Sequence, residues 1–492
     1  MPAPRKLLLI GIDAGDIGVI RANPSRLPRL NGWIGARGVR PLTSPADVLT
    51  SAIWPTFATG QPPGAHGVYY PMQWDAPAMQ LRRVGPEWVD YEPFWYPMAR
   101  AGRRVVVLDS PFSLPTRLKD GIEVQNWGSQ ECLTSFQCNR PDLGREILRR
   151  FGHHPMGEDV PVPAPTKRLL RTRDNLVQGA ARKAELARFL MGQGEWDLFV
   201  TVFAECHRGG HVLWRGDDAA SSHVPEGALL DVYAAVDKAV GSLVDAVDPK
   251  QTTVVVFSLH GMRANFTQEH YMMKVMERIN ARFRGDKTEF TEAPPRRASP
   301  MRLLREMVPP QLQFAIAKML PVGVRDWVVR RALCGGLDWQ KTPGFTIVAS
   351  CEGYIRLSFQ GREKDGMLAR DGEQARRYVD FVREQFMTLR DPQSGKPVVK
   401  EVVSCAGRYP GPRSDLLPDL VVLWEEVLPC DALESPSLGR MTGSLNTGRT
   451  GDHRAGGFAV ALDEGDALRG GPELRDAGDF AALARHVLGS PV

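Results

Sequence analysis

Residues 7–13 read Leu-Leu-Leu-Ile-Gly-Ile-Asp, an uninterrupted apolar run that ends in a carboxylate. Such a run, without alternating polar residues, is typical of a central strand that is covered on both faces of its sheet. Further runs of strand length occupy residues 104–108, 198–204, 252–258, 353–359, 419–424 and 457–462. Helical patterns occupy residues 141–151, 167–191, 226–247, 372–389 and 479–488. Because strands and helices alternate, the sequence predicts a large α/β sandwich.

The composition is that of an ordinary globular protein, with 492 residues, 43% hydrophobic and 24% charged. The net charge of +5 is scattered along the chain, so we expect no nucleic-acid partner. No run approaches the ~20 apolar residues of a membrane span, and the N-terminal run lacks a signal-peptide cleavage site. We therefore expect a cytoplasmic protein without a membrane partner. Seven cysteines without a CxxC pair indicate neither a disulfide framework nor a zinc ribbon.

The segment 262–344 differs from the rest of the chain, since it has charge-rich helical stretches and no strong strand pattern. We predict a mostly helical insertion there, between two parts of a catalytic core at 1–261 and 345–492. The insertion fits a cap beside the functional site and equally fits surface decoration.

Several side chains suited to a metal ion or a phosphoryl group are spread along the chain, and three of the five segments that carry them lie at or just beyond the end of a predicted strand. They are Asp13, Thr50, His207, His211, His260 and His453. On a helix, the spacing His207-x-x-x-His211 places both imidazoles on one face, as in many zinc sites. In a loop the pair is two unrelated surface histidines. Open α/β sheets place ligands at the carboxyl ends of their strands, which favours convergence of the set.

Each of these residues also has a purely structural interpretation. Asp13 fits the cap of a following helix, and His260 fits a polar strand end. Thr50 fits an N-cap, which is also where a nucleophilic hydroxyl gains from backbone N–H groups that face a phosphate. His66, within Pro-Gly-Ala-His-Gly at 63–67, fits turn structure better than a metal ligand.

Taken together, these segments resemble the type I phosphodiesterase/nucleotide pyrophosphatase family of the alkaline phosphatase superfamily. Gly-Ile-Asp-Ala-Gly-Asp at 11–16 is similar to its opening strand motif. Thr50 stands nine positions before Thr59-Gly60, as in the nucleophile helix of that family. Further landmarks lie at 353–357, 361–363, 418–422 and 451–454. The resemblance covers most of the chain outside the insertion.

The resemblance implies an alkaline phosphatase-like three-layer α/β sandwich with a large, mostly parallel central sheet. It also implies a site for two divalent metal ions, usually zinc. Asp13, Thr50 and His260 would surround one metal, with Thr50 as the nucleophile that forms a phospho-threonine. His207, His211 and His453 would hold the other metal.

Two departures from the family pattern affect the metals. Leu259 stands where the family has an Asp in Asp-His-Gly, and His207 stands where it has another Asp. With two fewer anionic ligands, a second cation should bind more weakly, so we expect one tight zinc ion and at most a weaker second one. Glu205 and Asp452 lie close enough in sequence to the ligands to compensate.

The sequence thus predicts a metal-dependent phosphodiesterase or phosphatase acting on a small-molecule phosphate ester. The main alternative is a degenerate member that binds a phosphorylated ligand without hydrolysis or catalyses another transfer in biosynthesis. A sulfatase ranks lower because residues 50–54 lack Cys/Ser-x-Pro-x-Arg, and a phosphoglycerate mutase would need Ser51 as its nucleophile. Neither the substrate nor the oligomeric state is indicated.

Overall fold

The computed structural model describes most of the chain but only the ends of the predicted insertion. The described residues are 5–129, 133–157, 163–216, 221–287, 290, 324, 337–347, 349, 351–445, 447–464 and 467–489. Most of the predicted cap, at 291–323 and 325–336, lies outside the described residues. The cap role of the insertion therefore stays a prediction.

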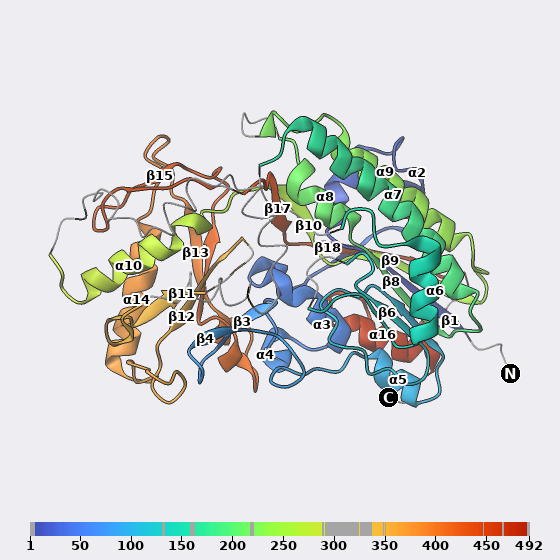
Figure 1. Ribbon diagram of the computed structural model, residues 1–492, viewed down its shortest axis with the longest axis horizontal. Helices are drawn as coiled ribbons and strands as arrows, with labels where there is room; N and C mark the ends of the chain where they lie inside the picture. Colours follow the sequence, from blue (N-terminus) through green and yellow to red (C-terminus); the bar gives the residue numbers. More distant parts are fainter. Residues whose placement is uncertain are drawn as a thin grey trace.

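An eight-stranded sheet forms the larger half of the molecule, on the right of Figure 1, in the order β2-β18-β9-β1-β8-β5-β6-β7. Its five central strands run parallel, namely β9 (Thr252–Ser258), β1 (Lys6–Ile12), β8 (Leu198–Phe203), β5 (Val105–Leu108) and β6 (Ile122–Gln125). Antiparallel pairs lie at both ends of the sheet: β18 (Gly457–Leu462) pairs antiparallel with β9 and with β2 (Arg40–Leu42), and β7 (Gln137–Cys138) pairs antiparallel with β6. The large, mostly parallel sheet predicted from the sequence is confirmed.

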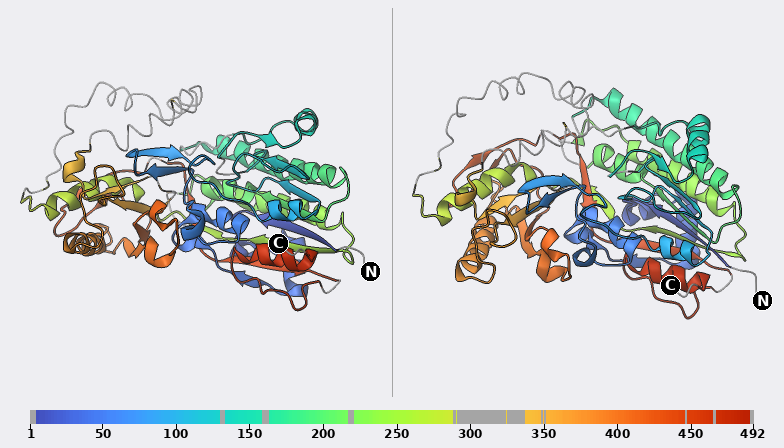
Figure 2. Two further views of the ribbon diagram at one scale, coloured as in Figure 1. Left: turned by 90° about the horizontal axis from the view of Figure 1, so that it is seen from below. Right: turned by 60° about the horizontal axis from the view of Figure 1, so that its bottom comes forward.

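Helices cover both faces of this sheet, which makes three layers (Figures 1 and 2). Alternate residues of β1 belong to different cores, because side chains along a strand point to opposite faces. Leu7 and Leu9 pack with the helices α3 (Ile53–Thr59), α5 (Trp95–Arg100) and α16 (Asp479–Leu488). Leu8 and Ile10 pack with the helices α6 (Pro141–Phe151), α7 (Thr166–Met191) and α9 (Ala228–Val244).

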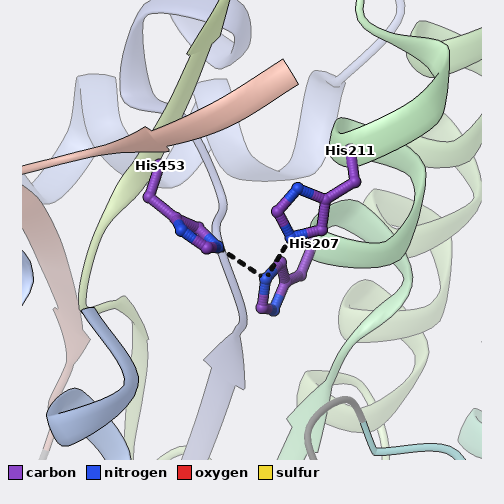
Figure 3. A group of neighbouring side chains, drawn as sticks. All are labelled: His207, His211 and His453. Carbon is purple, nitrogen blue, oxygen red and sulfur yellow. Dashed lines mark hydrogen bonds between the residues drawn. The ribbon is translucent and has the colours of Figure 1, made fainter. Parts of the chain in front are cut away.

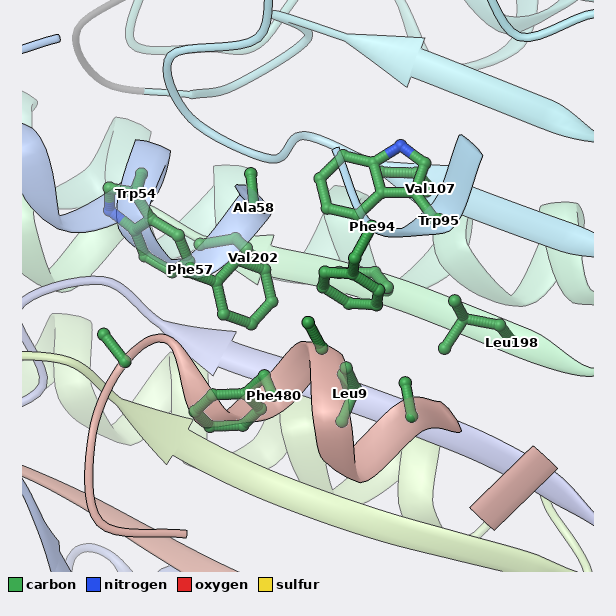
Figure 4. Close-up of a cluster of buried hydrophobic side chains, with 14 of the residues drawn as sticks. Leu9, Trp54, Phe57, Ala58, Phe94, Trp95, Val107, Leu198, Val202 and Phe480 are labelled. Carbon is green, nitrogen blue, oxygen red and sulfur yellow. The ribbon is translucent and has the colours of Figure 1, made fainter. Parts of the chain in front are cut away.

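Aromatic side chains dominate the core under α3. Trp54 and Phe57 of that helix meet Phe94, Trp95 and Phe480 in one buried cluster, drawn in Figure 4. Phe57 lies edge-on to Phe480, with ring centroids 5.1 Å apart. This core fixes the position of α3 on the sheet, and with it the turn that precedes the helix.

A second, four-stranded antiparallel sheet forms the other half, on the left of Figure 1, in the order β11-β12-β14-β13. Its strands are β11 (Gly344–Thr346), β12 (Gly353–Leu357), β14 (Leu420–Trp424) and β13 (Val399–Ser404). The helices α10 (Met272–Phe283) and α14 (Glu373–Met387) share a hydrophobic core with it. The sequence predicts 345–492 as a plain continuation of the first core, whereas these residues first build a separate lobe. β12 is buried along its whole length, so its apolar run resembles that of a central strand of the larger sheet.

The chain returns to the first half through a short antiparallel pair of strands that lie far apart in the sequence. β10 (Gly261–Ala264) pairs antiparallel with β17 (Gly451–Arg454), and Met262 lies opposite His453. The sequence predicts no strong strand within the insertion 262–344, and Gly-Met-Arg-Ala at 261–264 carries neither alternation nor β-branched side chains. This pairing brings the C-terminal segment beside the end of β9.

Candidate functional site

The candidate site lies at the carboxyl ends of three neighbouring parallel strands. Asp13 directly follows β1, and His260 follows β9 by two residues. The helix α8 (Glu205–Leu213) begins two residues after β8. Because β9, β1 and β8 are adjacent and parallel, these three segments meet at one edge of the sheet.

Three imidazoles converge at this edge, as Figure 3 shows. His207 and His211 lie one turn apart on α8, which is a regular helix, so the loop interpretation of the pair does not apply. His453 reaches the pair from β17. The Nε2 atom of His207 lies 2.8 Å from Nε2 of His453 and 2.9 Å from Nε2 of His211.

The other ring nitrogens show which tautomers are present. His211 Nδ1 lies 3.1 Å from the carbonyl oxygen of Gly451, which can only accept, so Nδ1 carries the proton. His207 Nδ1 lies 2.7 Å from Asp13 Oδ2 and donates to that carboxylate. Both Nε2 atoms therefore present lone pairs toward the same point, an arrangement that a bound cation stabilises.

Burial favours the neutral form of two of these imidazoles. It lowers the pKa of His211 and of His453 well below the usual value for histidine, and nearby charged groups act in the same direction. Burial alone would raise the pKa of Asp13, but its bonds to His207 and His260 bring it below the usual range. Three imidazoles backed by a carboxylate fit the donor set of a zinc site.

The Thr50 side of the site offers fewer ligands. Asp13 Oδ1 accepts a hydrogen bond from Trp54 Nε1 at 2.9 Å and lies 3.2 Å from His260 Nε2. Asp13, His207 and His260 form a second group whose ligand atoms lie within 4.8 Å of one another. Leu259 is fully buried in the core beneath α3 and supplies no charge. A second ion here would have Asp13 and His260 as its charged and imidazole ligands.

Thr50 begins the short 3-10 helix η2 (Thr50–Ala52), which leads into α3. Its side chain caps no helix N-terminus, unlike the N-cap role that its position in the sequence also allows. Instead the hydroxyl donates a hydrogen bond to Oε1 of Glu352, from the four-stranded lobe. Thr50 is 5% exposed, so the hydroxyl is shielded from bulk water.

Glu352 is a site residue that the sequence did not reveal. It directly precedes β12, one residue before the family landmark at 353–357. Burial and the neighbouring charge of Asp452 raise the pKa of Glu352 to about 7. The one available signal was a lone carboxylate placed immediately before a predicted strand.

A cavity of ≈ 410 Å³ opens between the two lobes beside these residues. Its wall includes Glu352, Asp452 and His453 from the site. Charges of both signs complete the lining, with Arg263, Lys400, Arg408 and Arg454 facing Asp47 and Glu401. The site is therefore reached through a polar, roughly charge-balanced space.

Other residues singled out in the sequence have different places. His66 ends the helix α4 (Pro63–His66), where its Nδ1 accepts from Val68 N at 3.0 Å and its Nε2 lies 3.1 Å from Thr56 Oγ1. The structure thus agrees with a structural role for His66. Glu205 lies against His154, with Oε1 3.2 Å from Nε2, and joins none of the metal-type groups. Asp452 forms a group with Cys351 and His453 on the cavity side.

Among the described residues, no helix is both long enough and apolar enough to cross a membrane.

The chain is similar to one protein-family model and to several solved structures. The family model of the type I phosphodiesterase / nucleotide pyrophosphatase matches residues 7–305. Phosphonoacetate hydrolase from Sinorhizobium meliloti 1021, solved with phosphonoformate, is 14% identical over 99% of this chain and 96% of that chain, with a TM-score of 0.48. An inactive variant of murine ectonucleotide pyrophosphatase / phosphodiesterase 5, solved with AMP, is 11% identical over 99% and 95%, with a TM-score of 0.49. No curated protein sequence matches the chain.

Proposed function

Because the chain belongs to the type I phosphodiesterase / nucleotide pyrophosphatase family, we propose that it is a metal-dependent phosphoric ester hydrolase with Thr50 as its nucleophile. The observation that best supports a metal is the convergence of three Nε2 atoms from His207, His211 and His453. Lone pairs so close together repel one another unless a cation lies between them. The substrate we propose is a small-molecule phosphate ester.

His207, His211 and His453 would hold the tighter ion, and Asp13 and His260 would hold a weaker one beside Thr50. A divalent ion bound here would offset negative charge on the phosphoryl group and on the departing oxygen. The family usually uses zinc, and the three neutral imidazoles suit that choice.

The side chains of the protein carry out the chemical steps. Thr50 Oγ1 attacks phosphorus, the bond to the leaving oxygen breaks, and a phospho-threonine results. Water then attacks phosphorus, releases phosphate and restores the hydroxyl. Since Thr50 is buried at the turn before α3, its hydroxyl is held in one place before the substrate arrives.

Leu259 favours a second candidate function, a member of the family that binds a phosphorylated ligand without hydrolysing it. Because Leu259 is an apolar residue packed in the core, the Thr50 side of the site lacks one carboxylate. Elemental analysis of the purified protein separates the two functions in part, because a pure binder needs no metal.

The decisive experiment compares wild type with Thr50→Ala on activated aryl phosphate mono- and diesters. We expect the variant to lose at least about 100-fold in rate, equivalent to ~2.7 kcal/mol of barrier. Thr59→Ala is the matched control, because Thr59 lies at the far end of α3, where its Oγ1 donates to the carbonyl oxygen of Pro55 and accepts from the backbone N–H of Gln61. A Thr50→Ala rate above about a tenth of wild type would exclude Thr50 and leave Ser51 as the next residue to test.

A further inference from the structure

The hydrogen bond from Thr50 to Glu352 joins the two lobes at the proposed nucleophile. The residues lie 302 positions apart in the chain, so the contact depends on how the lobes pack together. The second oxygen of Glu352, Oε2, accepts from the backbone N–H of Cys351 at 3.3 Å. These two bonds hold the carboxylate against the hydroxyl.

Asp13 is the other carboxylate at this edge of the sheet, and its oxygens already have partners. Oδ2 accepts from His207, while Oδ1 accepts from Trp54 and lies against His260. A proton leaving Thr50 therefore has a direct acceptor in Glu352 and none in Asp13. Leu259 adds no negative charge, because it is packed in the core.

We propose that Glu352 is a catalytic residue that accepts the proton of the Thr50 hydroxyl. The proposal rests on the function proposed above. In the step, the O–H bond of Thr50 breaks and its proton passes to Glu352 Oε1. The electron pair left on Thr50 Oγ1 forms the bond to phosphorus, and the leaving oxygen departs with its own bonding pair and takes one proton from solvent.

The second half of the reaction uses the same proton. Water attacks the phospho-threonine and gives one proton to solvent, while the bond from phosphorus to Thr50 Oγ1 breaks. Glu352 returns its proton to Oγ1, so both side chains regain their starting state. Glu352 of the four-stranded lobe thus acts as the base for Thr50, which belongs to the eight-stranded half.

The test uses Glu352→Gln, Glu352→Ala and the control Glu434→Gln, which removes an exposed carboxylate from the same lobe. We expect Glu352→Gln to lower kcat/KM by about 100-fold or more, with wild-type zinc content and thermal unfolding. Glu352→Ala leaves space beside the ≈ 410 Å³ cavity that a small carboxylate can enter. Sodium formate should therefore raise its rate, whereas sodium chloride at equal ionic strength should not. Glu434→Gln should hydrolyse at the wild-type rate.

Three results would overturn the proposal. They are a Glu352→Gln rate within about threefold of wild type, loss of a zinc equivalent from that variant, and no advantage of formate over chloride in Glu352→Ala. Zinc loss would make Glu352 a metal ligand instead. If Glu352→Gln does not fold, Glu352→Asp replaces it, and a wild-type rate there excludes the role because the shortened carboxylate cannot reach Oγ1.

Failure of the proposed function itself would give a different set of results. A wild type without phosphate ester hydrolysis, or a Thr50→Ala variant as active as wild type, contradicts the hydrolase assignment. An active wild type, an inactive Thr50→Ala and fully active Glu352 variants contradict only the role of Glu352.

Discussion

His207 donates a hydrogen bond from Nδ1 to Asp13 Oδ2 over 2.7 Å, while its Nε2 faces the other two histidines. One imidazole thereby connects the end of β1 to the three-histidine cluster. The orientation of the His207 ring therefore depends on Asp13. The carboxylate of Asp13 acts through that ring as well as through its own oxygens.

Replacing Asp13 should weaken the three-histidine site even though Asp13 is not one of its three imidazoles. Asp13→Asn keeps the shape but removes the charge that holds the proton on Nδ1 of His207. We expect zinc affinity to fall about 10- to 100-fold, the usual effect of losing such a partner. Competition with a chromophoric chelator measures this, and an unchanged dissociation constant would mean that the tautomer is fixed by other groups.

Removing His211 should abolish the tight metal equivalent. His211→Ala takes away the Nε2 atom that lies 2.9 Å from His207 Nε2, and two imidazoles alone hold zinc poorly. We expect the variant to lose its last zinc after dialysis against a chelator, together with activity. His223→Ala is a control, since His223 is exposed. Full zinc retention by His211→Ala would reduce the cluster to a buried polar group.

Leu259→Asp tests whether the missing carboxylate limits the second ion. Leu259 is 0% exposed and packs in the core beneath α3, so a carboxylate there costs several kcal/mol, roughly, unless a cation pairs with it. We expect the metal-free variant to unfold at a lower temperature than wild type, and zinc to recover part of the loss while a second equivalent binds more tightly. Zinc titration followed by thermal unfolding checks both. A variant that folds but binds no extra zinc, together with a wild type whose turnover does not respond to added metal, would contradict the two-ion scheme.

His66 should make the protein less stable in mild acid. Burial and Arg413 lower the pKa of His66 from 6.5 to about 3. Between these values the unfolded chain binds a proton that the folded protein does not, so stability falls as the pH falls. From pH 6 to pH 4.5 this amounts to about 2 kcal/mol.

Urea unfolding of wild type and His66→Gln at both pH values isolates this effect, because the other histidines contribute equally to both proteins. We expect the glutamine variant to lose about 2 kcal/mol less than wild type over that interval. Equal losses would show that His66 titrates normally in the folded state.

Much of the fold was predictable because central strands and amphipathic helices leave strong local patterns. The apolar run at 7–12 lies within β1, the predicted strand at 252–258 matches β9 in full, and the helix at 479–488 matches α16. The placement of Asp13, His207 and His260 just after predicted strands is also a local feature. These features depend on burial and periodicity, which a single sequence records well. The meeting of the three residues at one sheet edge depends on the strand order β9-β1-β8, which the sequence alone does not show.

The remaining features depend on contacts that no local pattern encodes. The second lobe is hidden because β12 is buried on both faces, like a strand of the larger sheet. β10 and β17 are four-residue strands held by pairing with each other, across a long stretch of chain. Glu352 reaches Thr50 only because one lobe packs against the other. The partner of the Thr50 hydroxyl is likewise decided by three-dimensional proximity.

The pairing of β10 with β17 has a consequence for the protein during its own synthesis. His453, which completes the three-histidine cluster, leaves the ribosome long after Asp13, Thr50 and His207. Strand β18, which lies between β9 and β2 in the sheet, is made later still. A nascent chain shorter than about 450 residues therefore carries the proposed nucleophile but not the complete three-histidine cluster. Zinc would then bind only late in synthesis, once the three-histidine cluster is complete, and shorter chains would have no hydrolase activity.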